Sequence, residues 1–354
     1  MKEQLFITEF DETVLPEEYH FSHNVAVRLH DDLVWLLDDK TIQKKLNVQI
    51  KFKPGDKRPK ENEKDILAWL SKNGRQKEVD QIISSHTLFA LISDTCHFIY
   101  ESLSSAKNVK MTVAYSLIRK PFLENLLIIE QLLIDEKAFL LKFEEKPEDF
   151  DPGKINDAQK KQLINDCLSK INSAFLSQDI IFDLRFDKKN PSSIYAISNL
   201  ATHLVTTRHP DFRTNANNLN LIFSGFDEWN SQLGHYYFFM PHLLFYAAEV
   251  IDKYLLEKKI ITLKNYKKRR FYRLIGQLLR HDQGDKKSIS GNSSSNKIVR
   301  YMKMKCKSCN KTNQLYKSDL FTLINNNHIL CKHCLINLFS ENNSLDITIN
   351  KFQG

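Results

Sequence analysis

The sequence predicts a mainly α-helical protein that ends in a small cysteine-rich module. Glycine and proline are scarce, with nine of each in 354 residues, which disfavours a turn-rich all-β fold. Apolar residues recur at helical spacing, for example at Ile82, Leu88, Ile92 and Ile99. Four of the six cysteines lie in two pairs near the C-terminus. These observations separate a large helical part from a small module.

We divide the chain into five segments by composition and apolar periodicity. They are an irregular or mixed region (1–78), a helical core domain (79–257), a basic amphipathic helix (258–281), a flexible linker (282–298) and a four-cysteine module (299–354). The linker is assigned because it is rich in Ser, Asn and Gly.

The first elements follow from apolar spacing and charge. We expect a helix within residues 31–45, an exposed charged loop at 51–64 and a helix over 82–100. The long apolar stretch 109–143 contains Pro121. A proline inside a helix removes a hydrogen bond, so the sequence predicts a kink or boundary there.

The rest of the helical part alternates between apolar helices and polar connections. Residues 123–141 should form a central core helix, followed by helices at 155–175, 192–206 and 236–257. Loops or connections are expected at 144–154, 182–191, 208–218 and 225–234. The most apolar run, 236–251, is too short to span a bilayer comfortably, so it is interpreted as a buried helix.

The paired cysteines have the spacing of a metal site. Cys306-x2-Cys309 and Cys331-x2-Cys334 are separated by 21 residues, which is near the standard spacing of a four-thiolate zinc site. Four thiolates close a tetrahedron and leave no position for a catalytic water, so a structural Zn²⁺ is predicted.

Around the cysteines the pattern resembles a zinc ribbon or treble clef. A short hairpin is expected at 320–330 and the start of a helix at 335–339. His328 and His333 lie nearby but are not needed as ligands when four thiolates are present.

The cysteines and the N-terminus bear on the cellular compartment in which the protein is expected. Cys96 and Cys167 lie in apolar periodic stretches, which is typical of buried free thiols. The N-terminus is acidic and lacks an apolar signal region. The sequence therefore predicts a cytoplasmic protein without a membrane partner.

Positive charge is concentrated in one segment. Residues 252–311 contain 18 Lys and Arg against four Asp and Glu, a net charge of +14 within a chain of net charge +8. Such a field suits a polyanion or an anionic membrane surface; the alternative is a solvated basic face or one docked on the acidic N-terminal part of the chain. Six cations of the amphipathic helix are the predicted contacts to DNA or RNA: Lys267, Lys268, Arg269, Arg270, Arg273 and Arg280.

A polar stretch between apolar helices holds the best candidates for catalysis. His203, Arg208, His209 and Arg213 combine groups that stabilise charge and transfer protons in phosphoryl-transfer or RNA-cleavage chemistry. The alternative is helix C-capping by Arg208 and His209 next to Pro210.

Residues 116–140 and 202–223 together resemble all-helical bacterial proteins, among them the HEPN-type domains of toxin and phage-defence systems. The resemblance covers roughly residues 80–255 and implies a helical fold with a role in defence. HEPN ribonucleases carry an Arg followed by a His, with four to six residues between them, and this chain has no Arg followed by a His at that spacing. Their catalytic residues therefore cannot be assigned here.

Three functions follow from these patterns. The first is a cytosolic nucleic-acid-associated protein, in a bacterial phage-defence or stress response, whose basic helix and zinc finger contact DNA or RNA. The second is an RNase or nuclease toxin that uses residues 203–213. The third is a non-catalytic scaffold whose finger binds a partner protein.

Overall fold

The computed structural model describes most of the chain. The described residues are 4–52, 54–55, 57–60, 64–173, 175–207, 213–222, 224–284, 302–326, 328–338 and 347–349. The mainly α-helical fold is confirmed. The predicted linker lies largely outside the described residues, and the preceding helix continues to Gly284.

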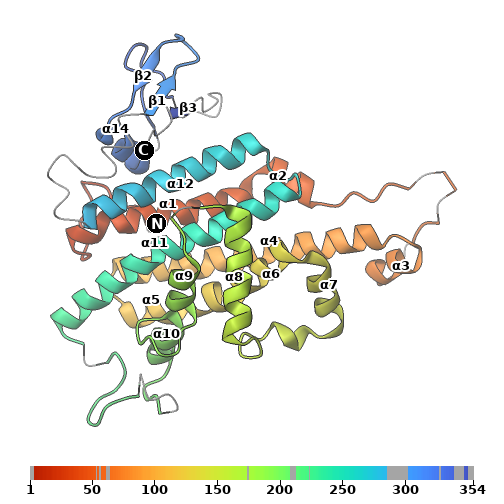
Figure 1. Cartoon of the computed structure of the whole chain (residues 1–354), viewed down its shortest axis with the longest axis horizontal. Helices are drawn as coiled ribbons and strands as arrows, with labels where there is room; N and C mark the ends of the chain where they lie inside the picture. Colours follow the sequence, from red (N-terminus) through yellow and green to blue (C-terminus); the bar gives the residue numbers. More distant parts are fainter. Residues whose placement is uncertain are drawn as a thin grey trace.

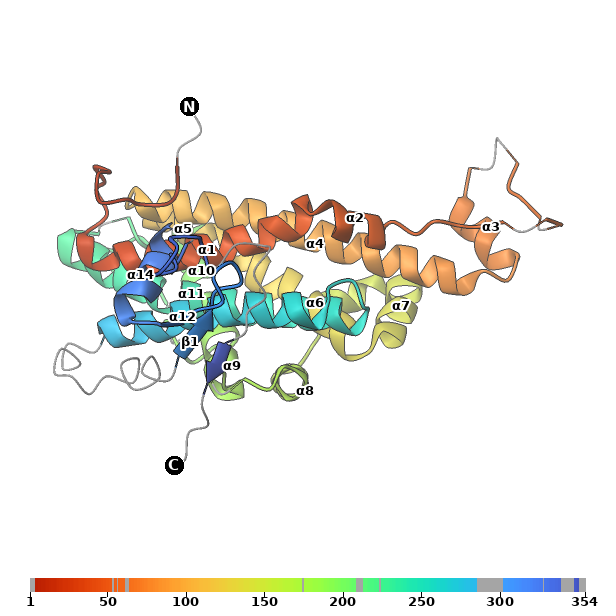
Figure 2. The same ribbon diagram turned by 90° about the horizontal axis from the view of Figure 1, so that it is seen from above.

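Four long helices form the frame of the helical body. They are α1 (Glu17–Asp38), α4 (Gln76–Lys107), α11 (Phe226–Glu257) and α12 (Leu263–Gly284). Helix α1 packs against α4, α11 and α12, and the four run along the long axis of the molecule (Figures 1 and 2). The apolar helix predicted at 236–257 is the buried centre of α11, because its Phe, Tyr, Leu and Val side chains fill the core.

Shorter helices cover this frame. Their bounds are α2 Lys40–Leu46, α3 Ile66–Lys72, α5 Met111–Leu117, α6 Leu126–Ile134, α7 Glu136–Glu145, α8 Asp157–Ile171, α9 Gln178–Arg185 and α10 Ile194–Thr202. Two predicted connections were wrong. Residues 182–185 belong to α9, which Ser177 caps, and residues 226–234 form the first turns of α11.

Pro121 marks the predicted break in the apolar stretch. The α-helical pattern stops after Leu117, and a π-helix (Lys120–Asn125) connects α5 to α6. A wider turn accommodates the proline ring, which would clash with the preceding turn of a regular α-helix. The Arg185 Nε donates a hydrogen bond to the Phe122 carbonyl oxygen of this segment, at 2.8 Å.

Arg185 also belongs to a fully buried polar cluster behind the π-helix. Its guanidinium contacts both carboxylate oxygens of Glu130, at 2.5 and 3.0 Å, and the Tyr246 hydroxyl donates to Glu130 Oε1 at 2.6 Å. A buried charge is tolerated when it is paired and hydrogen-bonded in this way. The cluster therefore ties α6, α9 and α11 together.

Helix α4 is the one helix of the described residues that is long and apolar enough to cross a membrane by length and composition alone. In this fold its apolar face, including Leu88, Ile92 and Ile99, is buried against the other helices of the body.

His23 of α1 predicts how stability changes with pH. Its Nδ1 accepts from the Tyr237 hydroxyl at 2.9 Å and its Nε2 donates to the Leu5 carbonyl at 2.8 Å. Burial lowers the pKa of His23 from 6.5 to about 4. The unfolded chain then binds a proton first, so this group lowers the free energy of unfolding as pH falls from 6.5 to 4, by about 3 kcal/mol in total.

Replacing His23→Gln should flatten the dependence of urea unfolding on pH in that window. The exposed His86 is a matched control, and His86→Gln should leave the dependence unchanged. Equal slopes for wild type and His23→Gln would contradict this assignment.

The C-terminal module combines a small sheet with one helix. Strands β1 (Met302–Lys305), β2 (Thr312–Gln314) and β3 (Ile347–Ile349) form an antiparallel sheet in the order β2-β1-β3. The hairpin predicted at 320–330 is wrong, because residues Lys317–Asn326 form helix α14. The helix start expected at 335–339 is also wrong: Asn337 pairs with Leu330 in an isolated β-bridge.

This module is docked on the helical body rather than held away from it. Helix α14 packs against α1 and α12, and Figure 1 shows the module above α12. Arg28 of α1 donates to the carbonyls of Ile324 and Asn325, both at 2.9 Å, and so caps the C-terminus of α14. Phe21 packs edge-on against Phe321, with the ring centroids 5.1 Å apart.

Candidate metal centre

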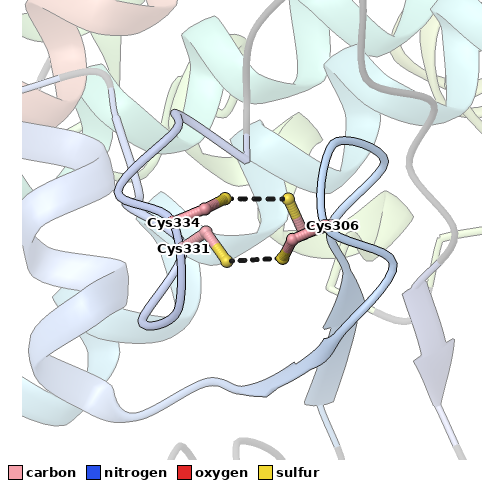
Figure 3. A group of neighbouring side chains, drawn as sticks. Cys306, Cys331 and Cys334 are labelled. Carbon is pink, nitrogen blue, oxygen red and sulfur yellow. Dashed lines mark hydrogen bonds between the residues drawn. The ribbon is translucent and has the colours of Figure 1, made fainter.

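The four predicted cysteines converge on one point of the module. Their sulfur atoms all lie within 4.8 Å of one another. Cys306 Sγ is 3.6 Å from Cys334 Sγ, and Cys309 Sγ is 3.6 Å from Cys331 Sγ (Figure 3). A disulfide would need about 2.05 Å. The arrangement is therefore that of four separate thiols that can bind a metal ion.

Each Cys-x2-Cys pair sits in a tight turn. The first turn joins β1 to β2, and the Cys306 N–H donates to the Lys311 carbonyl at 2.9 Å. The second follows α14, and the Cys331 N–H donates to the Ile336 carbonyl at 2.8 Å. In both, the residue after the second cysteine is left-handed: Asn310 has φ 57° and Leu335 has φ 59°. The two turns thus share one backbone form.

The environment of the sulfur atoms favours a bound cation. Burial alone would raise the pKa of Cys331. Hydrogen bonds from the N–H groups of His333 and Cys334 outweigh that effect and lower the pKa to about 6. At Cys334 the N–H of Ile336 lowers the pKa, while burial and the three neighbouring sulfur atoms raise it to about 12. Four thiolates this close repel one another, so a metal ion is needed to hold all four in the charged form.

The two nearby histidines lie outside this cluster. His328 Nδ1 is 3.1 Å from the Asn326 carbonyl, and the His333 side chain is exposed. The cluster among the described residues consists of the four cysteines alone. The sequence therefore predicted every member of this cluster, because the spacing of each pair is a local property of the chain.

Two of the predicted nucleic-acid contacts on α12 are not available to a ligand. Arg269 and Arg273 are buried, and their guanidinium groups face carboxylates of α1 and α11. Arg273 contacts Asp32 Oδ2, Asp252 Oδ2 and Glu249 Oε1, each at 2.7 Å. The expectation that these two arginines lie on an exposed basic face is wrong.

Arg273 is part of a larger group of buried charges to which Arg269 and Arg270 also belong. We call this group the ion cluster and define it as Asp32, Glu249, Asp252, Arg269, Arg270 and Arg273. Arg269 Nε is 2.9 Å from Asp252 Oδ2, and Arg270 Nε is 3.1 Å from Glu249 Oε2. Burial raises the pKa of Asp252, but Arg269 and Arg273 together lower it below its ordinary value. The cluster contains three cations and three anions, so its formal charge is zero.

Arg280 serves another helix. Pro241 lies inside α11 and has no N–H to offer the Tyr237 carbonyl one turn earlier. Arg280 Nη1 lies 3.4 Å from the Tyr237 carbonyl and 3.2 Å from that of Phe238. Burial lowers the pKa of Arg280 to about 10. Arg280 therefore compensates for the proline rather than presenting charge to solvent.

Of the two predicted lysines, Lys267 is exposed and Lys268 is half-buried. The basic segment 252–311 continues onto the cysteine module, whose lysines were not among the six predicted contacts. Four exposed lysines lie along β1 and the first cysteine turn: Lys303 and Lys305 in the strand, and Lys307 and Lys311 in the turn that leads to β2. The signal was the alternation Met-Lys-Met-Lys in β1, which buries both methionines and exposes both lysines.

The candidates for catalysis are only partly described. His203 and Arg213 are both exposed. The His203 carbonyl accepts a hydrogen bond from Asn220 at 2.7 Å, so this residue ends α10 in a polar turn. Arg208 and His209 lie outside the described residues. No geometry among the described residues brings this set together as a catalytic site.

Comparisons of the chain with protein-family models, with curated proteins and with solved structures found no match.

Proposed function

We propose that the four-cysteine module holds a structural Zn²⁺ and binds nucleic acid through its lysines. The sulfur spacing supports zinc. With Zn–S bonds of about 2.3 Å, the edges of a regular tetrahedron are about 3.8 Å long. The Cys306–Cys334 and Cys309–Cys331 sulfur distances, both 3.6 Å, are close to that edge, and all four sulfur atoms lie within 4.8 Å of one another. A bound zinc would supply structural support here, since four thiolates fill its coordination shell.

The observation that carries nucleic-acid binding is the row of exposed lysines at 303, 305, 307 and 311. Residues 302–338 contain six lysines and one acid, Asp319. Asp319 is engaged by Lys332 at 3.3 Å. Among the described residues 302–338, no other acid is available to neutralise the lysine row, and phosphates are the natural counterions for such a surface. A reducing cytosol goes with this proposal, because thiolate ligands must stay reduced.

The test is the salt dependence of oligonucleotide binding by the full chain. Wild type and the variant Lys303→Gln/Lys305→Gln/Lys307→Gln/Lys311→Gln are titrated against a labelled 16-nucleotide single strand by fluorescence anisotropy. Each lysine that contacts a phosphate contributes about 0.7 to the slope of log affinity against log salt. The variant's slope should therefore be smaller in magnitude by up to about 3.

A matched variant removes the same charge from the helical body: Lys40→Gln/Lys44→Gln/Lys137→Gln/Lys189→Gln. All four of these lysines are exposed. Its slope should match that of wild type. Equal losses in both variants would mean that net charge alone, and not the lysine row, causes binding. Absence of binding by wild type at low salt would refute the proposal.

A further inference from the structure

Apolar side chains gather beside the lysine row, around the second cysteine turn. Four large side chains there are exposed: Tyr316 by 57%, Leu330 by 46%, Leu335 by 72% and Ile336 by 44%. We call these four residues the apolar patch. They come from the N-terminus of α14 and from the second cysteine turn. Contiguous exposed apolar side chains of this kind are typical of an interaction surface.

The patch is continuous with the basic surface. Lys332 Nζ lies 3.9 Å from the centre of the Tyr316 ring and donates to the Gln314 carbonyl at 2.8 Å. Gln314 of β2 pairs with Lys303 of β1. A hollow of about 250 Å³ is lined by Lys332, Leu330 and Leu335, together with α14 residues. Strand β2 therefore lies between the lysines of β1 and the apolar patch.

Leu335 shows that the patch is costly to the free protein. Its φ of 59° is left-handed. This conformation is strained for an L-residue with a bulky side chain, whereas glycine and asparagine adopt it readily. The equivalent position of the first turn carries Asn310, at φ 57°. The second turn instead carries a leucine that gains little burial within its own chain.

We infer that the apolar patch contacts unpaired bases, so that the module prefers single-stranded nucleic acid to duplex. This inference rests on the proposed function. Lysines neutralise the phosphates of either form, but the faces of bases are open to Tyr316, Leu335 and Ile336 only where the bases are unstacked. In a regular duplex the same apolar side chains would meet stacked pairs and phosphates.

The test compares two probes and two matched variants. The probes are a labelled 16-nucleotide strand of mixed sequence and the same strand in a duplex. Leu335→Gly removes the side chain and relieves the left-handed strain. Asn310→Gly makes the same backbone change in the first turn. Wild type should bind the single strand more tightly than the duplex.

Leu335→Gly should weaken binding to the single strand by at most about fivefold, because an aliphatic contact should contribute no more than the weakest aromatic stacking contacts with a base. Its duplex affinity should not change, and Asn310→Gly should match wild type on both probes. Leu335→Gly should also hold zinc against a chromophoric chelator at least as well as wild type, which separates loss of contact from loss of fold.

A second variant keeps the inference testable if Leu335→Gly loses zinc. Tyr316 precedes α14 at its N-cap, where serine is favoured, so Tyr316→Ser removes the ring without weakening the helix start. It too should lose affinity for the single strand alone. Unchanged single-strand binding in a zinc-loaded variant, or equal losses on both probes, would overturn the inference. Failure of wild type to bind either probe would instead refute the proposed function.

Discussion

Replacing Arg273→Met is expected to lower the free energy of unfolding of the helical body by about 3–5 kcal/mol. The side chain is fully buried and contacts three carboxylates, those of Asp32, Glu249 and Asp252. Burial lowers the pKa of Arg273, but those three carboxylates raise it well above its ordinary value, so the group stays charged. Without Arg273, the buried carboxyl groups of Glu249 and Asp252 lose the guanidinium group that they share.

Urea unfolding followed by circular dichroism measures this loss. The double variant Arg273→Met/Asp252→Asn removes one cation and one anion, so it should recover part of the stability. Arg119 forms a longer ion pair with Glu124, at 3.8 Å, and both groups are exposed. Arg119→Met should cost less than about 1 kcal/mol. A loss for Arg273→Met as small as that for Arg119→Met would contradict the role of the ion cluster.

Replacing Cys331→Ser should abolish stoichiometric metal binding. The apparent free energy of binding of a structural zinc is about 10–16 kcal/mol in small zinc modules, and much of it is folding free energy. With one thiolate lost, the two cysteine turns are no longer joined, and the module between 302 and 338 should open. The helices of the body have their own core, so the helical circular dichroism should largely persist.

Elemental analysis of the purified variant reports the metal, and limited proteolysis reports the opening of the module. Cys96→Ala serves as the control, since Cys96 is buried in the helical body away from the cluster. It should retain metal in full. One equivalent of metal in Cys331→Ser would contradict the assignment of the four thiolates.

The sequence was sufficient where the determining interactions are local. The spacing within each Cys-x2-Cys pair predicted all four residues of the cysteine cluster, and Pro121 marked the change of helix type. Helix α14 was missed because residues 320–324 alternate like a strand, and short apolar runs do not distinguish the two structures. Asp319, whose carboxylate accepts from the Tyr316 N–H at 2.8 Å, was the overlooked sign of a helix start.

The arginines of α12 required contacts that sequence spacing does not contain. Their carboxylate partners lie on α1 and α11, up to 241 residues away along the chain. A usable signal did exist. Glu249 lies within the most apolar run of the chain, and Asp252 follows directly after it. A carboxylate buried in such a helix needs a cationic partner, and the next helix supplied a row of arginines.

The docking of the module changes what its lysines can do. The Arg28 contacts with the C-terminus of α14 fix the module on α1, so the lysine row has a defined position on the helical body. A module fixed in this way presents its charge without the entropy loss of ordering a free arm. The lysine row includes Lys307, which lies between Cys306 and Cys309 in the first cysteine turn. A metal that holds this turn in place should therefore be a condition for nucleic-acid binding.

The most direct test of this account is the affinity of the full chain for a single-stranded oligonucleotide before and after removal of the metal. Both forms are measured at the same low salt concentration, and zinc is then restored to the stripped sample. The account predicts binding by the metal-loaded protein, loss of binding on chelation and recovery with added zinc. Equal affinity of the loaded and stripped forms would contradict it.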